Sequence, residues 1–338
     1  MAKENTKVGL LKNLVFAGEA RADGGVSAPV EEGRFRYFWQ TFRAHNGQLL
    51  LINLLFLVTL LPLLAILVTS SVIGVETLSY KLHGVENIPY FLSGAGFGVS
   101  SASSVLQARL DMLDVYAWEF LFIGIAIMIS GIGFAGMIPV CVKFIWKDSF
   151  VTKRDSYGND VPKVVVEFFK GIKKYWWQML IVTAMLGALV AAVGNSFVYF
   201  IGQNWQGKAG AGEWILIIIA SLVAVFGAIF IIYMLPTVVL YDISFLGKMK
   251  NAAIFTVQMI LQNIFVLAVV ALPFVIIAVT SGFINIILVA IMLVFGAPFY
   301  CLLISNYVQF YSEKIITPVF QARSAKGKKS NKKGKNKK

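Results

Sequence analysis

The sequence is short of charge, and several long stretches contain none. Only 14% of its 338 residues are Asp, Glu, Lys or Arg, whereas 58% are hydrophobic, and the mean hydropathy is +0.76. A soluble domain of this length usually has roughly 25% charged residues. The shortage excludes an ordinary soluble fold. It predicts an all-α bundle of transmembrane helices with lipid as its main solvent.

Residue types that carry out catalysis or bind metals are also scarce. The two histidines, His45 and His83, fall on opposite sides of the membrane in the topology derived below, so they cannot share a metal or a general base. Phosphate-binding glycine loops, zinc-protease motifs and nucleophile elbows are absent. Asp111 and Asp114 could form an acid/base pair, although a solvated helix face explains them better. We therefore expect no enzyme activity, no cofactor and no metal site.

Ionisable residues are missing from the middle of every predicted span. A proton-coupled transporter usually keeps such a residue as a relay. Proton-coupled transport is therefore disfavoured, while a sodium site built from backbone carbonyls stays open.

Six stretches are long and apolar enough to cross a hydrocarbon core, which takes roughly 20 helical residues. The predicted spans are residues 49–70, 118–142, 177–201, 214–240, 263–283 and 284–304. The last two adjoin, so a tight hairpin is expected around Ser281 and Gly282.

Lysine and arginine are distributed very unevenly between the loops. Of the 30 Lys and Arg residues, 27 fall in the leader, in the loops after the second and fourth predicted spans, and in the tail. Only Lys81, Arg109 and Lys208 fall on the other side. Positive charge is retained in the cytoplasm. The prediction is therefore a multi-pass protein with both termini cytoplasmic. On that side a reducing environment makes a disulfide between Cys141 and Cys301 improbable.

Tryptophan prefers the headgroup level and gives an independent check of the topology. We predict an inner membrane-interface set, joined by Lys173 and Lys174, and an outer set. The inner tryptophans are Trp39, Trp146, Trp176 and Trp177, and the outer ones are Trp118, Trp205 and Trp214.

Three regions follow from composition. Residues 1–33 are a polar cytoplasmic leader, 34–324 are the membrane domain and 325–338 are a tail expected to be disordered, with eight lysines after Ala325. Such a tail beside a membrane is attracted to anionic lipid, and a purely solubilising role is the alternative. It lacks interleaved aromatic residues, so no specific nucleic acid is expected as a partner. The segment 71–117 is predicted as an outer loop with a helix from Val105 to Trp118.

The sequence also contains weak internal similarity. The run from Phe38 to Gln48 resembles the run from Phe168 to Gln178, and a weaker copy lies at 253–263. Helix-kinking prolines fall in the even spans at Pro139, Pro236 and Pro298. Three parallel hairpins would explain both features. Chance is the alternative, because proline is common in membrane helices.

Small residues recur at four-residue spacing in spans three and four. The alanines at 184, 188 and 192 in one, and at 220, 224 and 228 in the other, predict close contact between those two helices.

Gly136-Met-Ile-Pro139, the basic-aromatic exit Lys143–Lys147 and the run Phe168–Gln178 together resemble the YesL-like family of small bacterial membrane proteins. The resemblance covers about the central third of the chain. It implies location in the bacterial inner (cytoplasmic) membrane and an association with carbohydrate ABC transporters, whose permease subunits become candidate partners. The family provides no catalytic residue. The long outer segment and the lysine tail depart from its pattern.

Two functions therefore come forward. The first is a non-enzymatic accessory or assembly protein of a carbohydrate ABC uptake system. The second is a small-solute permease with a cavity between the helical hairpins. A membrane-embedded enzyme is a poor third, because the chemistry is missing.

Overall fold

The structure is a computed structural model that describes residues 33–83, 105–146, 152–154, 160–279 and 283–311. Several sequence predictions lie outside these residues. They concern the leader up to residue 32, the part of the predicted outer loop at residues 84–104, the hairpin at Ser281 and Gly282, and the lysine tail.

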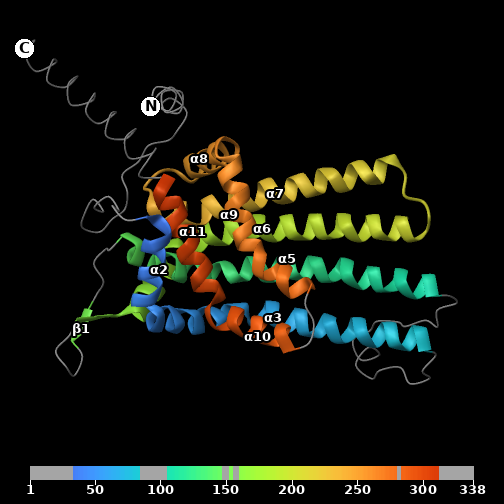
Figure 1. Ribbon diagram of the computed structural model, residues 1–338, viewed down its shortest axis with the longest axis horizontal. Coiled ribbons are helices and arrows are strands. Elements are labelled where there is room, and N and C mark those ends of the chain that lie inside the picture. Colours follow the sequence, from blue (N-terminus) through green and yellow to red (C-terminus); the bar gives the residue numbers. More distant parts are fainter. Residues whose placement is uncertain (1–32, 84–104, 147–151, 155–159, 280–282, 312–338) are drawn as a thin grey trace, which may run out of the picture. The chain divides into compact units, whose positions relative to one another are not determined.

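The described chain is almost entirely helical (Figure 1). One small antiparallel hairpin interrupts it, with Thr152 opposite Pro162. In chain order the elements are α2 (Arg34–Ala44), α3 (Asn46–His83), α5 (Val105–Trp146), β1 (Thr152–Arg154), β2 (Asp160–Pro162), α6 (Val164–Trp205), α7 (Ala211–Leu240), α8 (Phe245–Gln258), α9 (Ile260–Val279), α10 (Phe283–Ile291), the π-helix η1 (Met292–Gly296) and α11 (Ala297–Tyr311).

Within the described residues, six helical segments are long and apolar enough to span a bilayer, as predicted. They are Asn46–Thr69, Arg109–Trp146, Val164–Trp205, Ala211–Leu240, Ile260–Ile277 and Ile284–Phe310. The chain is a multi-pass integral membrane protein.

Several helices extend beyond their predicted spans. The segment 71–117, predicted mainly as loop, is helical up to His83 and again from Val105. This prediction was wrong because the stretch after Ser70 contains no proline and one glycine, Gly74, so nothing breaks α3 there. The predicted helix starting at Val105 is confirmed, and it is continuous with the second span.

The lengths of α5 and α6 fit the predicted positions of the tryptophans. Trp118 and Trp146 are 28 residues apart in α5, and so are Trp177 and Trp205 in α6. At 1.5 Å per residue this is about 42 Å. A bilayer with its headgroup regions is about 40–45 Å thick. Both helices are therefore long enough to place a tryptophan at each surface.

The described chain divides into two compact units. Among the described residues, unit 1 takes those that fall within 33–57, 132–179 and 229–311, and unit 2 those that fall within 58–131 and 180–228. The helices α3, α5, α6 and α7 each contribute one part to each unit.

Close backbone approach in unit 2 occurs between α5 and α6. A Cβ at Gly187 would overlap the carbonyl group of Gly124, and a Cβ at Gly124 would lie 2.6 Å from the carbonyl oxygen of Gly187. The close contact predicted between spans three and four, α6 and α7, is not made through Ala188 and Ala192, which are exposed; an added Cβ at Gly227 of α7 would lie 2.6 Å from the Leu189 side chain of α6. Between α5 and α6 the residues at the contact are glycines, since a methyl group on either would meet backbone atoms of the other helix.

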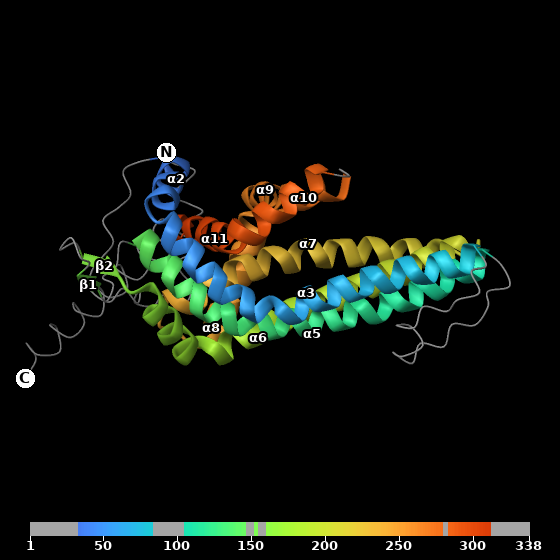
Figure 2. The ribbon, with the colours of Figure 1, turned by 90° about the horizontal axis from the view of Figure 1, so that it is seen from below.

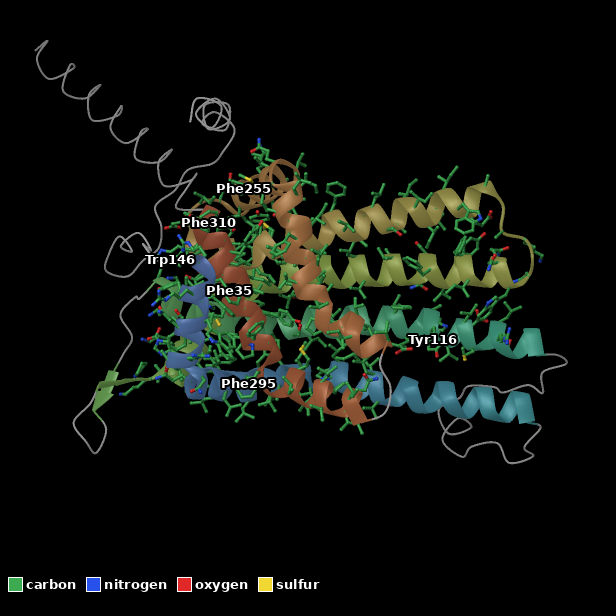
Figure 3. The ribbon with its side chains drawn as sticks, in the orientation of Figure 1. Phe35, Tyr116, Trp146, Phe255, Phe295 and Phe310 are labelled. Atoms are coloured by element: carbon green, nitrogen blue, oxygen red, sulfur yellow. The ribbon has the colours of Figure 1, made fainter. Side chains whose placement is uncertain are left out.

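Unit 1 brings the two ends of the described chain together. The helices α2 and α11 lie side by side (Figures 1 and 2). Phe38 is buried, and its ring lies edge-on to Phe299 with centroids 5.2 Å apart. In the view of Figure 3, Phe35, Trp146, Phe255 and Phe310 gather at one end of this unit.

Candidate functional site

Polar side chains are concentrated in the interior of unit 1. The buried ones are Thr41, Asn53, Glu167, Thr237, Lys248, Asn251, Thr256, Asn263, Ser305, Asn306 and Gln309. A polar group costs free energy in a dry interior unless it is hydrogen-bonded. The partners of these groups therefore show what the cluster does.

Asn53 of α3 serves the backbone beside Pro298. Its Nδ2 donates to the carbonyl oxygens of Leu293 and Val294, each at 2.7 Å. Proline has no N–H to donate. In an α-helix this leaves the carbonyl four residues earlier without its donor, and in a π-helix it leaves the carbonyl five residues earlier without one. Those two residues are Val294 and Leu293. Whichever of the two carbonyls the missing N–H leaves without a donor, the Asn53 amide of α3 donates to it.

Lys248 of α8 caps the end of α7. Its Nζ donates to the Val238 carbonyl oxygen at 2.9 Å and to Gln178 Oε1 at 3.1 Å. Val238 lies in the last turn of α7, where carbonyls have no partner within the helix and a cation complements the helix dipole. The lysine is only 1% exposed. The sequence treats it as an ordinary positive charge of a loop, whereas the structure places it in the core.

Asn263 of α9 joins three helices. Its Nδ2 donates to the carbonyl oxygens of Phe255 and Thr256 at 3.0 and 3.1 Å, in the last turn of α8. Its Oδ1 accepts from the hydroxyl groups of Tyr233 (2.8 Å) and Tyr307 (2.6 Å), which belong to α7 and α11. The Nδ2 and the Oδ1 of this amide therefore each make two hydrogen bonds, which hold these helices together.

The end of α5 is held in two ways. The hydroxyl of Tyr37 on α2 donates to the Ile145 carbonyl oxygen at 2.6 Å. Glu167 on α6 forms a salt bridge with Lys143 at 2.8 Å and a second with Lys170 at 3.1 Å. The carboxylate is buried, while the Lys170 side chain is 56% exposed.

Arg34 connects α2 to α11. Its Nη1 donates to Gln309 Oε1 at 3.2 Å, and its own carbonyl oxygen accepts from Asn306 Nδ2 at 3.2 Å. Its guanidinium carbon lies 5.3 Å from the centre of the Phe310 ring. These contacts tie the first described helix to the last one.

Three buried polar atoms have no hydrogen-bond partner within the described residues. They are Asn53 Oδ1, Ser305 Oγ and Asn306 Oδ1. Ser305 and Asn306 are adjacent on α11. Buried polar atoms of this kind call for an explanation, such as an ordered water or a bound solute.

The predicted kink prolines lie inside helices. Pro139 is in α5, Pro236 in α7 and Pro298 near the start of α11, directly after η1. Odd spans contain prolines too, at Pro62 in α3 and Pro273 in α9. Proline is therefore not a mark of the even spans alone.

The predicted interface residues differ in exposure. Trp39, Trp118, Trp176, Trp177, Trp205 and Trp214 are exposed, and so are Lys173 and Lys174. Trp146 is the exception, since it is buried at the end of α5. Its side chain packs inside unit 1.

The segments before the odd spans share a pattern of burial. All three are helical, and α2 and α8 each end at one non-helical residue, His45 (φ −120°, ψ 16°) and Met259 (φ −107°, ψ 30°). Tyr175 is the matching residue in the continuous α6. The residues eight, seven and four positions before it, and four after it, are buried in every copy. They are Tyr37, Phe38, Thr41 and Leu49; Glu167, Phe168, Gly171 and Met179; Asn251, Ala252, Phe255 and Asn263.

Aligning the three segments by this pattern of burial shifts the third one by one residue. With Met259 as the reference, the weaker copy runs from 252 to 262 rather than from 253 to 263. Gln48, Gln178 and Gln262 then occupy equivalent positions. The physical reason is the break in the helix at Met259, which the residue types alone do not reveal.

The predicted kink prolines also resemble one another in what lies one turn before them, although the partner residues Phe168, Phe255 and Phe42 are not at equivalent positions of their segments. Three residues before each of Pro139, Pro236 and Pro298 lies a residue that contacts one of the amphipathic segments. Gly136 packs against the Phe168 ring. The ring centres of Tyr233 and Phe255 are 5.6 Å apart, and those of Phe295 and Phe42 are 6.4 Å apart. The last of these contacts joins η1 to α2.

Comparison with family models, with curated proteins and with solved structures finds no match for this chain.

Proposed function

We propose that the protein is a non-enzymatic scaffold of the bacterial cytoplasmic membrane, acting as an accessory or assembly factor for a carbohydrate ABC uptake system. The observation that carries the scaffold part is the use of the buried polar groups. Asn53, Lys248 and Asn263 each hold backbone carbonyls of neighbouring helices. Groups used in this way fix helix positions. A transport pathway would need them free to exchange with solute.

The scaffold is a closed set of three hairpins of one plan, each with an amphipathic helix, an outgoing span and a proline-containing return. Support comes from the shared burial register and from the contacts that Gly136, Tyr233 and Phe295, each three residues before a proline, make with the amphipathic segments. Closure by α2 and α11 gives a stiff framework. The link to carbohydrate uptake rests on the resemblance to the YesL-like family.

A permease is the second candidate, and the unpartnered polar atoms favour it. Ser305 Oγ and Asn306 Oδ1 are buried on α11 without a hydrogen-bond partner in the described part of the chain. A small solute with hydroxyl groups would satisfy both atoms.

Co-purification and flux separate the two functions. The full chain is isolated with mild detergent from its own membrane, and associated proteins are identified and quantified. For the scaffold we expect an ABC permease subunit in near-equal amount, and no uptake of radiolabelled glucose or maltose by vesicles that contain the isolated protein. Sugar uptake that Asn306→Leu abolishes, without a co-purifying subunit, would establish the permease instead.

A further inference from the structure

The outward faces of α2 and of the first turns of α6 present the same side chains in the same register. Trp39 and Arg43 are exposed on α2, and Phe169 and Lys173 are exposed at the equivalent positions of α6. Residues four apart lie on one face of a helix. Each helix therefore presents an aromatic ring with a base one turn later.

The third copy lacks this face. The equivalent positions on α8 are Ala253 and Val257, which provide neither a ring nor a charge. The ring-and-base face is therefore not a by-product of the shared fold. It is a property of two copies, and the third provides an internal comparison.

Positive charge on these two faces is not neutralised by exposed acids of the same helices. α2 contains no Asp or Glu. On α6 the acid of the first turn, Glu167, is buried and paired with Lys143 and Lys170. Lys173 and Lys174, farther along, are both exposed. The electrostatic balance of these faces favours an anionic partner.

The position of the two helices identifies that partner. α2 leads into the span of α3 through one residue, and the first turns of α6 continue into their own span. Both faces therefore lie next to the membrane surface. Trp39 is 39% and Phe169 57% exposed. Exposed rings suit the boundary between headgroups and acyl chains, and nearby bases suit phosphate.

We propose that α2 and the first turns of α6 each bind the headgroup of an acidic phospholipid. The aromatic ring inserts at the acyl boundary, and Arg43, or Lys173 with Lys174, contacts the phosphate. The Arg43 guanidinium carbon already lies 5.1 Å from the centre of the Trp39 ring, so ring and base act at one place. These two sites are distinct from the lysine tail. They depend on membrane insertion and not on the proposed scaffold role.

The test measures lipid selectivity of the full chain. Protein is reconstituted in mixed phosphatidylglycerol and phosphatidylcholine, and relative association constants are measured with spin-labelled lipids. The triple variant Arg43→Gln, Lys173→Gln, Lys174→Gln should lose its preference for phosphatidylglycerol, by about fivefold for each cation removed. Binding of phosphatidylcholine should not change.

Two further variants make the test specific to these faces. The charge-conserving variant Arg43→Lys, Lys173→Arg, Lys174→Arg should keep the preference of the native chain. Lys250→Gln on α8 removes an exposed cation from the copy without a ring and should have little effect. The proposal is overturned if the triple variant keeps its selectivity for phosphatidylglycerol. It is also overturned if Lys250→Gln lowers this selectivity as much as the triple variant does for each cation removed. It is equally overturned if Trp39→Ala with Phe169→Ala leaves it unchanged.

Discussion

At the residue scale, the hydrogen bonds of Asn53 show how the membrane environment constrains a proline. No water reaches a carbonyl in the bilayer core. A carbonyl that loses its N–H donor because of Pro298 therefore needs another donor from the protein. Asn53 provides that donor for Leu293 and Val294. The asparagine and the proline should therefore be coupled energetically.

Replacing Asn53 tests this coupling. Asn53→Leu should lower the free energy of unfolding by about 1 kcal/mol, because two carbonyls lose their donor. Reversible unfolding in bicelles measures the change. Asn195→Leu is the matched control, since Asn195 Nδ2 donates only within its own helix, to Ala191 at 2.9 Å.

A double-mutant cycle makes the reason explicit. Pro298→Ala restores an N–H, so Asn53→Leu should cost less in that background than in the native chain. Equal costs in both backgrounds would show that Asn53 does not serve the proline.

The two salt bridges of Glu167 should differ in strength, although they share one carboxylate. The Lys143 side chain is 17% exposed and that of Lys170 is 56% exposed. Lys143→Met should therefore lower the unfolding free energy by roughly 2 kcal/mol, because a buried carboxylate loses its better-protected partner. Lys170→Met should change it by less than about 0.5 kcal/mol. Thermal unfolding of the two variants at one ionic strength gives the comparison, and a reversed order would contradict it.

At the scale of helices, glycine determines which ones meet. The contact of Gly124 with Gly187 places α5 against α6 in unit 2. A methyl group on either residue meets backbone atoms of the other helix, which cannot rotate away as a side chain can.

Gly187→Ala should therefore destabilise the protein, even though alanine is the better helix former by about 1 kcal/mol. We expect a lower midpoint of thermal unfolding. Gly47→Ala is the control, because nothing lies within 4 Å of its added Cβ. That change should be neutral or stabilising. A stabilised Gly187→Ala variant would show that the helices separate at no cost.

The single non-helical residues His45 and Met259 form joints, each between an amphipathic helix and the span that follows it. At each joint the backbone N–H donates to the carbonyl four residues earlier, at 3.2 Å. Leu49 and Asn263, four residues later, then donate back to the joint carbonyl, at 2.9 and 2.8 Å. An amphipathic helix can thus turn into a span without leaving these backbone groups unpaired.

At the scale of the whole molecule, the charge distribution predicts the orientation in the membrane. A reporter placed after Lys338 and one inserted near Gly158, between β1 and β2, should both be cytoplasmic. A reporter near Gly96 should be external. Accessibility to a membrane-impermeant thiol reagent, with a single cysteine at each position, provides the measurement. Labelling of Gly96→Cys and Gly158→Cys from the same side would contradict the six-span topology.

Composition and hydropathy were enough to predict the six spans, because insertion in lipid depends on the sum of side-chain transfer free energies along a segment. The helix starting at Val105 was predictable for a similar local reason. Local pattern also indicated the amphipathic segments at Phe38 and Phe168. Each of these features is a property of consecutive residues.

Tertiary structure alone decided the roles of Lys248, Asn53 and Trp146. In sequence, Lys248 is a loop cation, Asn53 a lone amide and Trp146 an interfacial ring. Their burial depends on carbonyls and helices that are distant in the chain, such as Val238 for Lys248 and Val294 for Asn53. The alignment of the segment 252–262 with the other two likewise depended on the break at Met259. Sequence determined which segments enter the membrane, and packing determined which polar groups hold them together there.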